Sequence, residues 1–217
     1  MMRLLLLLAV VLIPHIGHAQ MGIPFAFTSD DDNKLIKEND SVKLYRATDD
    51  SAHIVSINEE TNYYRLLTKG RRVIAEGAFI ADGDHYLQDG KWTQYFENGR
   101  VMLTGYYKRS KQVGTWEEYF QGGKVKVIAN YGIMIDKDGI SSCMSGSYQE
   151  FYGNGKLKVN GFYGAERKKV ADTVEVEDPV SGTKSRHVVS QSTYVAQKTG
   201  TWEYYTEEGE FDKKEEH

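Results

Sequence analysis

The sequence has little cysteine, little proline and no surplus of basic residues. Its one cysteine, Cys143, excludes an intrachain disulfide framework and a zinc or iron–sulfur site built on several cysteines. Its 27 basic residues are outnumbered by 31 acidic ones, which excludes a nucleic-acid binder that works through overall positive charge. What is present is 12% aromatic residues and 21 glycines among 217 residues, a mixture typical of many short β-strands and unlike a helical bundle or a disordered linker.

The first nineteen residues have the features of a secretory signal peptide. A short positive start precedes the apolar run Leu4–Ile13, and Gly17 and Ala19 place small residues where a signal peptidase cuts. A run of this length cannot cross a hydrocarbon layer about 30 Å thick, and Pro14 ends it, which argues against a membrane-spanning or a core helix. We therefore expect cleavage after Ala19 and an exported bacterial protein, periplasmic or secreted, with no transmembrane segment in its mature chain.

The mature chain contains an internal repeat. In each copy a glycine is followed by an aromatic residue two positions on, a second aromatic three positions later and a second glycine four positions after that. A degenerate copy begins with Tyr64 and Leu67. Trp92 and Trp116 lie 24 residues apart, so the basic unit has this length and the longer separations contain insertions. The glycines and aromatics of the four full copies are Gly90, Trp92, Tyr95, Gly99, Gly114, Trp116, Tyr119, Gly123, Gly146, Tyr148, Phe151, Gly155, Gly200, Trp202, Tyr205 and Gly209.

In three of the full copies, the segment after the second glycine alternates with a period of two residues. This period predicts half-buried β-strands with one apolar and one wet face, and the helical period of 3.6 residues is absent. Asn98-Gly99 and Asn154-Gly155 are strong hairpin signals, because tight turns need residues that adopt positive φ readily. Each unit is therefore predicted to be a β-hairpin. The residues predicted on the apolar face include Val101, Leu103, Gly105, Tyr107, Ala129, Tyr131, Gly161 and Tyr163.

Two details of the repeat predict how its rings pack. Gly105, Ala129 and Gly161 are small residues inside strands, where they leave room for a large ring from the adjoining hairpin. The spacing from Trp92 to Tyr95 is odd, which in a regular strand places the two rings on opposite faces. Either a bulge brings both rings to one face, or both faces of the sheet carry an aromatic row.

The pattern of glycine, aromatic, aromatic, glycine and an alternating strand that ends in Gly-x-Tyr resembles the bacterial MORN-repeat variant. This is the repeat found in the YwqK-like antitoxin family. The resemblance covers roughly residues 64 to 211. It implies an all-β fold in which stacked β-hairpins form an elongated antiparallel sheet, and it implies a binding or neutralising role.

The segment 20–62, before the repeats, is predicted to be a linker and a cap. Ser29–Asn33 is rich in aspartate and is expected to be a solvated linker. The apolar residues between Val42 and Ile57 indicate a short hairpin that shields the first repeat.

The repeat array occupies residues 63–217 and is interrupted by two insertions. We expect residues 132–145 to extend two strands around an Asp-Lys-Asp-Gly turn. Residues 164–199 are expected to form a protruding hairpin that turns near Asp178-Pro179. The longer insertion is either a tolerated surface ribbon or a partner-binding arm.

The sequence offers no catalytic or metal-binding motif. The turn at Asp136–Gly139 lacks the bidentate glutamate of a calcium loop, and no serine-hydrolase, P-loop or zinc-protease motif is present. Adjacent strand residues such as Glu117 and Glu118 point to opposite faces, which argues against a glycosidase pair. We therefore expect no enzyme activity, no cofactor, and no catalytic, metal or cofactor-binding residue. The histidines beyond the predicted signal peptide are neither paired nor spaced like metal ligands: His53, His85, His187 and His217.

Two non-enzymatic function classes fit these observations. The first is an exported interaction scaffold or immunity-type binder that holds another protein through the sheet face or the 164–199 insertion. The second is a cell-envelope or glycan-binding protein whose aromatic rows stack on sugars. Buried lead aromatics favour the scaffold, and exposed, aligned ones favour glycan binding. An enzyme assembled from scattered residues is a third class, and no nucleic-acid partner is expected.

Overall fold

The computed structural model describes residues 27–28, 33–38, 42–47, 53–68, 70–83, 85–137, 139–177 and 184–217, and all regular structure in these ranges is β-strand. The predicted signal peptide, most of the expected acidic linker and the turn near Asp178-Pro179 lie outside the described residues. Within the described ranges, no helix has the length and apolar character needed to cross a membrane.

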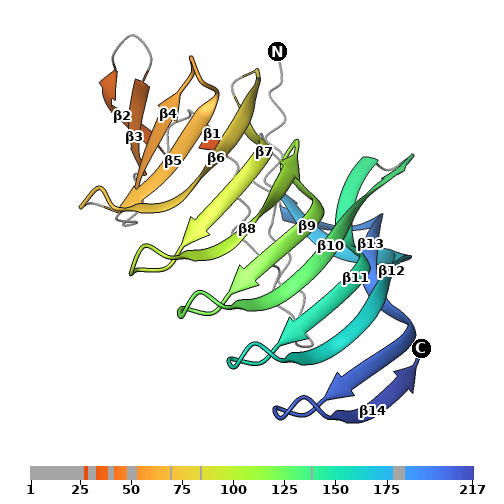
Figure 1. The fold of residues 1–217 in the computed structure, drawn as a ribbon. Helices are drawn as coiled ribbons and strands as arrows, with labels where there is room; N and C mark the ends of the chain where they lie inside the picture. Colours follow the sequence, from red (N-terminus) through yellow and green to blue (C-terminus); the bar gives the residue numbers. More distant parts are fainter. Residues whose placement is uncertain are drawn as a thin grey trace.

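The strands form one antiparallel sheet in which β2 to β14 follow one another in chain order, while β1 pairs with β7. Figure 1 shows the strands stepping along the molecule toward β14. The predicted all-β sheet of stacked hairpins is confirmed. The strands are β1 (Phe27–Thr28), β2 (Asn33–Glu38), β3 (Val42–Ala47), β4 (His53–Asn58), β5 (Tyr63–Thr68), β6 (Val73–Asp82), β7 (His85–Tyr95), β8 (Val101–Lys108), β9 (Lys111–Tyr119), β10 (Val125–Asp136), β11 (Gly139–Phe151), β12 (Leu157–Glu177), β13 (Lys184–Tyr205) and β14 (Phe211–Glu216).

The second glycine of each repeat lies in the turn between the two strands of its hairpin. In the first of these turns the Gly99 N–H donates to the Phe96 carbonyl at 2.9 Å, and the Phe96 N–H donates to the Arg100 carbonyl at 2.8 Å. The glycine takes the left-handed conformation that this short loop requires. The hairpins predicted at Asn98-Gly99 and Asn154-Gly155 are therefore confirmed. Values of φ are 80°, 91°, 94° and 87° at Gly99, Gly123, Gly155 and Gly209.

A basic residue directly after the turn glycine ties one turn to the next in three hairpins. Arg100 Nη1 donates to the Gly122 carbonyl at 2.7 Å. Lys124 Nζ donates to the Asn154 carbonyl at 2.9 Å, and Lys156 Nζ donates to the carbonyl of Glu208. These hydrogen bonds link successive hairpins along the side of the sheet where the turns lie. Figure 1 shows these turns as a row of loops.

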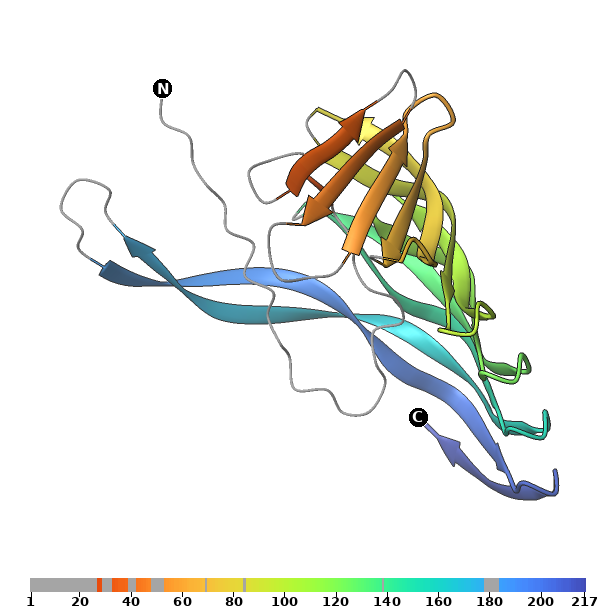
Figure 2. The same ribbon diagram turned by 90° about the vertical axis from the view of Figure 1, so that its left-hand side faces the viewer.

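The first glycine of each repeat lies inside a strand, where the register breaks. Strand β6 pairs with β7 at Gly77 and Trp92 and again at Phe79 and Gln88, so that one β6 residue faces three β7 residues. Positive φ at the glycine allows this wide bulge. The bulges recur at one level of the sheet, and Figure 2 shows that the sheet is curved. Values of φ are 115°, 64°, 121° and 65° at Gly90, Gly114, Gly146 and Gly200.

One face of the sheet, called here the inner face, buries a ladder of aromatic rings that forms the core. The tyrosine that ends one hairpin stands between the lead rings of that hairpin and the next. Trp92, Tyr107, Trp116 and Tyr131 follow one another at ring-centroid distances of 6.2, 5.0 and 6.2 Å, each close to edge-to-face. The lead aromatics, with 0–4% of their surface exposed, are Tyr64, Trp92, Trp116, Tyr148 and Trp202.

Small residues on the inner face make room for these rings. A Cβ added to Gly105 would overlap the ring of Trp116, and a Cβ added to Gly161 would overlap the ring of Trp202. Ala129 occupies the same place in the intervening unit, opposite Trp116 in register, and is fully buried. The prediction that these positions accommodate a ring from the adjoining hairpin is confirmed at both glycines.

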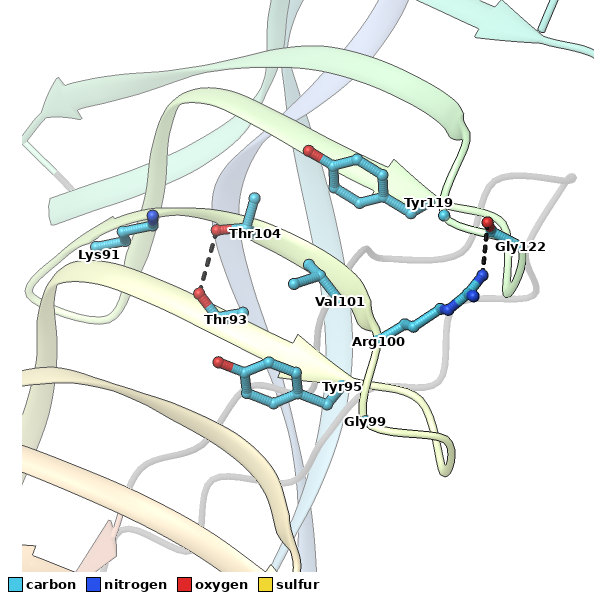
Figure 3. Close-up of a pocket in the computed structure, with 10 residues that line it drawn as sticks. Lys91, Thr93, Tyr95, Gly99, Arg100, Val101, Thr104, Tyr119 and Gly122 are labelled. Atoms are coloured by element: carbon cyan, nitrogen blue, oxygen red, sulfur yellow. Dashed lines mark hydrogen bonds between the residues drawn. The ribbon is translucent and has the colours of Figure 1, made fainter.

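The second aromatic of the repeat lies on the opposite, outer face. Trp92 is buried on the inner face, whereas Tyr95 lies with Thr93 and Thr104 on the outer face, as Figure 3 shows. Both faces therefore carry aromatic residues, which is the second of the two alternatives that the odd spacing left open.

A bulge in the second strand of each hairpin overturns one part of the predicted alternation. Gln94 pairs with Leu103 and Tyr95 pairs with Val101, so Met102 is an extra residue. An extra residue reverses the facing of the positions beyond it. Val101 consequently lies on the outer face beside Tyr95, and not on the inner face with Leu103 as predicted. The same register shift recurs in the later hairpins.

Residues 132–145 and 164–199 both extend pairs of antiparallel strands, as predicted. The first lengthens β10 and β11 as far as the pair of Asp136 with Gly139. The second continues the pairing of β12 with β13 from Gly164–Gln197 out to Glu177–Lys184, and Figure 2 shows this ribbon projecting well beyond the sheet. We call it the arm.

The N-terminal end of the sheet holds one strand more than expected. Strands β3 and β4 form a hairpin that pairs with β5, at the place predicted for a cap. Strand β2 pairs with β3 on the other side and begins at Asn33, a residue predicted to lie in the linker. Asn33 is polar but is part of a strand, because it pairs with Ala47 of β3.

Strand β14 closes the other end of the array with different residues. Trp202 pairs with Glu215, at the position that Gly105 occupies opposite Trp92 and Ala129 occupies opposite Trp116. Its ring contacts the ring of His217 at 6.3 Å, where the other tryptophans contact a tyrosine. Lys213 Nζ and the Tyr204 hydroxyl donate to the Glu215 carboxylate at 2.7 and 2.8 Å. These hydrogen bonds lower the pKa of Glu215 to about 2.

Candidate binding surfaces

The fold uses the repeat residues for its own structure. The first glycines lie in bulges, the second glycines in turns, and the lead aromatics and strand-end tyrosines in the inner ladder. Burial raises the pKa of Tyr107 to about 12 and raises the pKa of Tyr64 and Tyr148 further, so these phenols stay neutral and serve packing. Because the lead rings are buried, they present no exposed row to a sugar.

The outer face carries a second row of rings, all half-buried, with one ring on every second strand. The Tyr95 hydroxyl donates to Glu76 Oε1 at 2.7 Å, and the Tyr119 hydroxyl donates to Glu117. Partial burial and the hydrogen bond to Glu76 raise the pKa of Tyr95 to about 12. These carboxylates hold the rings in place on the strands. The outer row consists of Tyr95, Tyr119, Phe151 and Tyr205.

A groove of about 780 Å³ opens on the outer face between Tyr95 and Tyr119. Its floor is the cross-strand pair of Thr93 and Thr104, whose hydroxyl oxygens lie 3.3 Å apart. Figure 3 shows the two rings on either side of this pair, with Lys91 at one end and Arg100 at the other. The remaining lining residues are Gly99, Val101, Gly122 and Gly123.

The groove exists because this repeat departs from the later ones. The position of Thr93 is held by Glu117, Gln149 and Glu203 in the following copies. Those longer side chains cover their strands, and Glu203 reaches the Tyr205 hydroxyl at 3.1 Å. The shorter threonine leaves the surface open. The residues that the copies share do not indicate this site, because it depends on a position where this copy differs from the later ones.

A second surface lies at the tip of the β10–β11 hairpin and is apolar. Ile135 and Ile140 face each other across the two strands, and 74% and 50% of their surfaces are exposed. Ile133, two residues before Ile135 and therefore on the same side of β10, is 38% exposed. We call these three residues the isoleucine tip. Contiguous exposed apolar side chains of this kind mark interaction sites.

The isoleucine tip is joined to the base of the arm. Asp136 lies between the exposed isoleucines in sequence, and its carboxylate pairs with Arg167 Nε of β12 at 3.0 Å. Lys168 and Glu166 form a further pair at 3.3 Å next to it. The apolar tip is thus bordered by charges of both signs.

Metal-ligating side chains do not cluster among the described residues. These residues contain no group of three or more His, Cys, Asp or Glu placed to hold a metal ion. Cys143 is buried, and burial raises the pKa of its thiol, which disfavours the reactive thiolate. Glu117 binds Tyr119 on the outer face, whereas the neighbouring Glu118 pairs with Lys126 at 2.7 Å, so the two carboxylates act separately.

The comparison with known families identifies three of the hairpin units. The model of the MORN repeat variant matches residues 88–109, 112–131 and 144–164. Repeats of this type are found in binding or scaffold proteins. The units of Tyr64 and Trp202 continue the same sheet outside the matched residues. No curated protein and no solved structure matches the chain.

Proposed function

We propose that the protein is an exported, non-enzymatic repeat scaffold that holds a protein partner on the isoleucine tip and the adjoining base of the arm. The observation that carries the proposal is the exposed pair of Ile135 and Ile140 on a hairpin that the repeat frame does not need. Strands β8 and β9 are joined by Arg109 and Ser110 alone, so a unit of this sheet closes without a long extension.

The chemistry of this surface fits a folded protein partner. Burying apolar side chains contributes roughly 25 cal/mol per Å² removed from water, against which the entropic cost of association must be set. Interfaces of this kind combine an apolar centre with a polar rim, and the Asp136–Arg167 and Glu166–Lys168 pairs supply such a rim next to the tip. The rim charges favour one orientation of the partner.

Two further arguments support the exported, binding role. The run Leu4–Ile13 and the small residues before Gln20 favour secretion. The MORN-variant repeats occur in binding and scaffold proteins, and the resemblance to YwqK-like antitoxins favours a partner that is held or neutralised. The partner is then a protein met outside the cytoplasm, so the role is closer to immunity or scaffolding than to neutralising a cytosolic toxin.

The test is a crosslinking capture from the cell envelope of the native host, with the wild-type protein and an Ile135→Asp/Ile140→Asp variant expressed at equal levels. We expect a discrete crosslinked protein with the wild type and its loss with the variant. Mass spectrometry of the same material should give Gln20 as the mature N-terminus.

Phe162→Asp is the matched control, because Phe162 is also an exposed apolar residue, at 54%, but lies on β12 before the arm begins. It should leave the capture unchanged. Capture that survives the isoleucine changes, or an uncleaved chain in the cytosol, contradicts the corresponding part of the proposal.

A further inference from the structure

The groove between Tyr95 and Tyr119 holds two aromatic rings at a spacing that the strands of the sheet fix. Neighbouring strands lie about 4.8 Å apart, so rings on β7 and β9 are separated by about 9.6 Å along the sheet. This is close to the length of a disaccharide in a β-1,4-linked chain. Both rings are half-buried and are fixed by hydrogen bonds to Glu76 and Glu117, so little conformational freedom is lost when a ligand stacks on them.

The polar groups around the two rings suit a ligand that is rich in hydroxyl groups and carries no charge. The floor offers the Thr93 and Thr104 hydroxyls, and in register Glu76 lies beside Thr93 while Glu117 lies beside Thr104. The surroundings of the groove thus carry charges of both signs, with Arg65 paired to Glu76 at 2.9 Å and with Lys91 and Arg100 at the ends of the groove. Arg100 Nη1 is moreover engaged with the Gly122 carbonyl, which directs this side chain toward the neighbouring turn.

The position of the groove argues against an extended peptide as the ligand. Strands β7, β8 and β9 are interior strands, each paired on both sides, so no free strand edge is available for β-augmentation. Recognition at this surface must come from side chains. Ring faces combined with hydroxyls and carboxylates are the groups that bind the apolar faces and hydroxyl groups of sugars.

We propose that this groove binds a β-1,4-linked oligosaccharide, with sugar rings stacked on Tyr95 and Tyr119 and sugar hydroxyls bonded to the Thr93–Thr104 floor. The site is distinct from the isoleucine tip, and the two are independent. The outer row continues at Phe151 and Tyr205, so a longer chain would run along the sheet and cross its strands.

The test is a ligand-observed NMR titration of the purified protein with cellotetraose, the β-1,4-linked glucose tetramer, and with maltotetraose, its α-1,4-linked counterpart. We expect saturable binding of cellotetraose with Kd in about the millimolar range or tighter. Maltotetraose, which is curved, should bind about tenfold more weakly, because it cannot place two rings flat at this spacing.

The sharpest variant is Thr93→Gln, which gives this repeat the residue that Gln149 supplies in a later copy, fills part of the groove and adds no charge opposite Glu76. It should weaken cellotetraose binding at least about tenfold and leave the melting temperature nearly unchanged. Tyr119→Ala should weaken binding to a similar extent, because it removes one of the two stacking rings. Phe162→Ala, which removes an exposed outer-face ring outside the row, should bind like the wild type.

Three results would overturn the proposal. One is the absence of saturable cellotetraose binding at up to about 10 mM. Another is equal affinity for the two tetramers. The third is undiminished binding by both Thr93→Gln and Tyr119→Ala. If Thr93→Gln does not fold, the result for Tyr119→Ala decides.

Discussion

The inner and outer faces of the sheet are made by the same strands, but the inner face repeats its residues from unit to unit and the outer face varies them. On the inner face every unit presents a buried lead ring, and Gly77, Gly105 and Gly161 each lie against one. On the outer face the residue next to the lead ring changes from Thr93 to Glu117 to Gln149. The repeated face holds the fold together, and the varied face is where the units differ in the size and charge of their side chains.

The largest effect expected from this comparison is at the centre of the inner ladder. Trp116→Ala should lower the free energy of unfolding by about 3 to 5 kcal/mol, because its ring packs between Tyr107 and Tyr131 and has no exposed surface. Trp202→Ala should cost less, because beyond it only β14 follows, and Lys198 lies over its ring at 4.3 Å. Urea unfolding of both variants measures the difference.

Equal losses of stability in the two tryptophan variants would contradict a sheet whose units contact mainly their neighbours. They would indicate a domain that unfolds as one closed core. A matched outer-face change, Tyr205→Ala, serves as the control and should cost less than either, since its ring is only half-buried.

Gly105 and Thr104 are adjacent residues of β8 that point to opposite faces of the sheet. Substituting either one should cost less stability than Trp116→Ala. Gly105→Ala should cost about 1 to 3 kcal/mol, because the new methyl group meets the Trp116 ring and the ring must shift. Thr104→Ala removes a hydroxyl that donates to the Trp92 carbonyl at 3.0 Å and should cost about 0.5 to 1.5 kcal/mol. Thermal and urea unfolding of the two variants compare the stability that each face contributes at this place in β8. A larger loss for Thr104→Ala than for Gly105→Ala would mean that the inner face tolerates repacking.

The smallest effect is expected from the arm. Replacing residues 164–199 with the short segment Lys108–Val113 should leave circular dichroism nearly unchanged and shift Tm by no more than about 4 °C. The replacement removes the ion pair of Arg167 with Asp136 at the base of the arm, which is partly exposed and of the kind worth up to about 1 kcal/mol. An unfolded product would show that the arm is part of the core. Retained capture of the partner would confine the interface to the isoleucine tip.

The sequence predicts the regular part of this molecule well, because period-two alternation and turn glycines act locally. Gly99 and Gly155 form the turns that their Asn-Gly pairs indicate, and Gly105 makes room for a ring as its size predicts. The bulge at Met102 could not be predicted, because a strand does not reveal which of its residues lacks a partner. The predicted facing of Val101 was wrong for that reason.

The candidate sites were harder to predict than the fold. The isoleucine tip falls in an insertion whose length the sequence shows, but the exposure of Ile135 depends on how far β10 and β11 extend beyond their neighbours. The groove depends on Thr93 being short where other copies are long. Both sites are departures from the repeat, and periodicity describes only what is repeated.

Glu215 changes the character of the inner face at the β14 edge of the sheet. A further unit would have to place its lead ring against β14 as Trp116 lies against Gly105, but here the slot opposite Trp202 holds a carboxylate bonded to Lys213 and Tyr204. An ionised side chain at the end of a stacked array denies a second molecule the surface on which a fibre would grow. At this edge of the sheet the inner face therefore ends on a charged, hydrogen-bonded side chain where the other hairpins present a small residue to a ring.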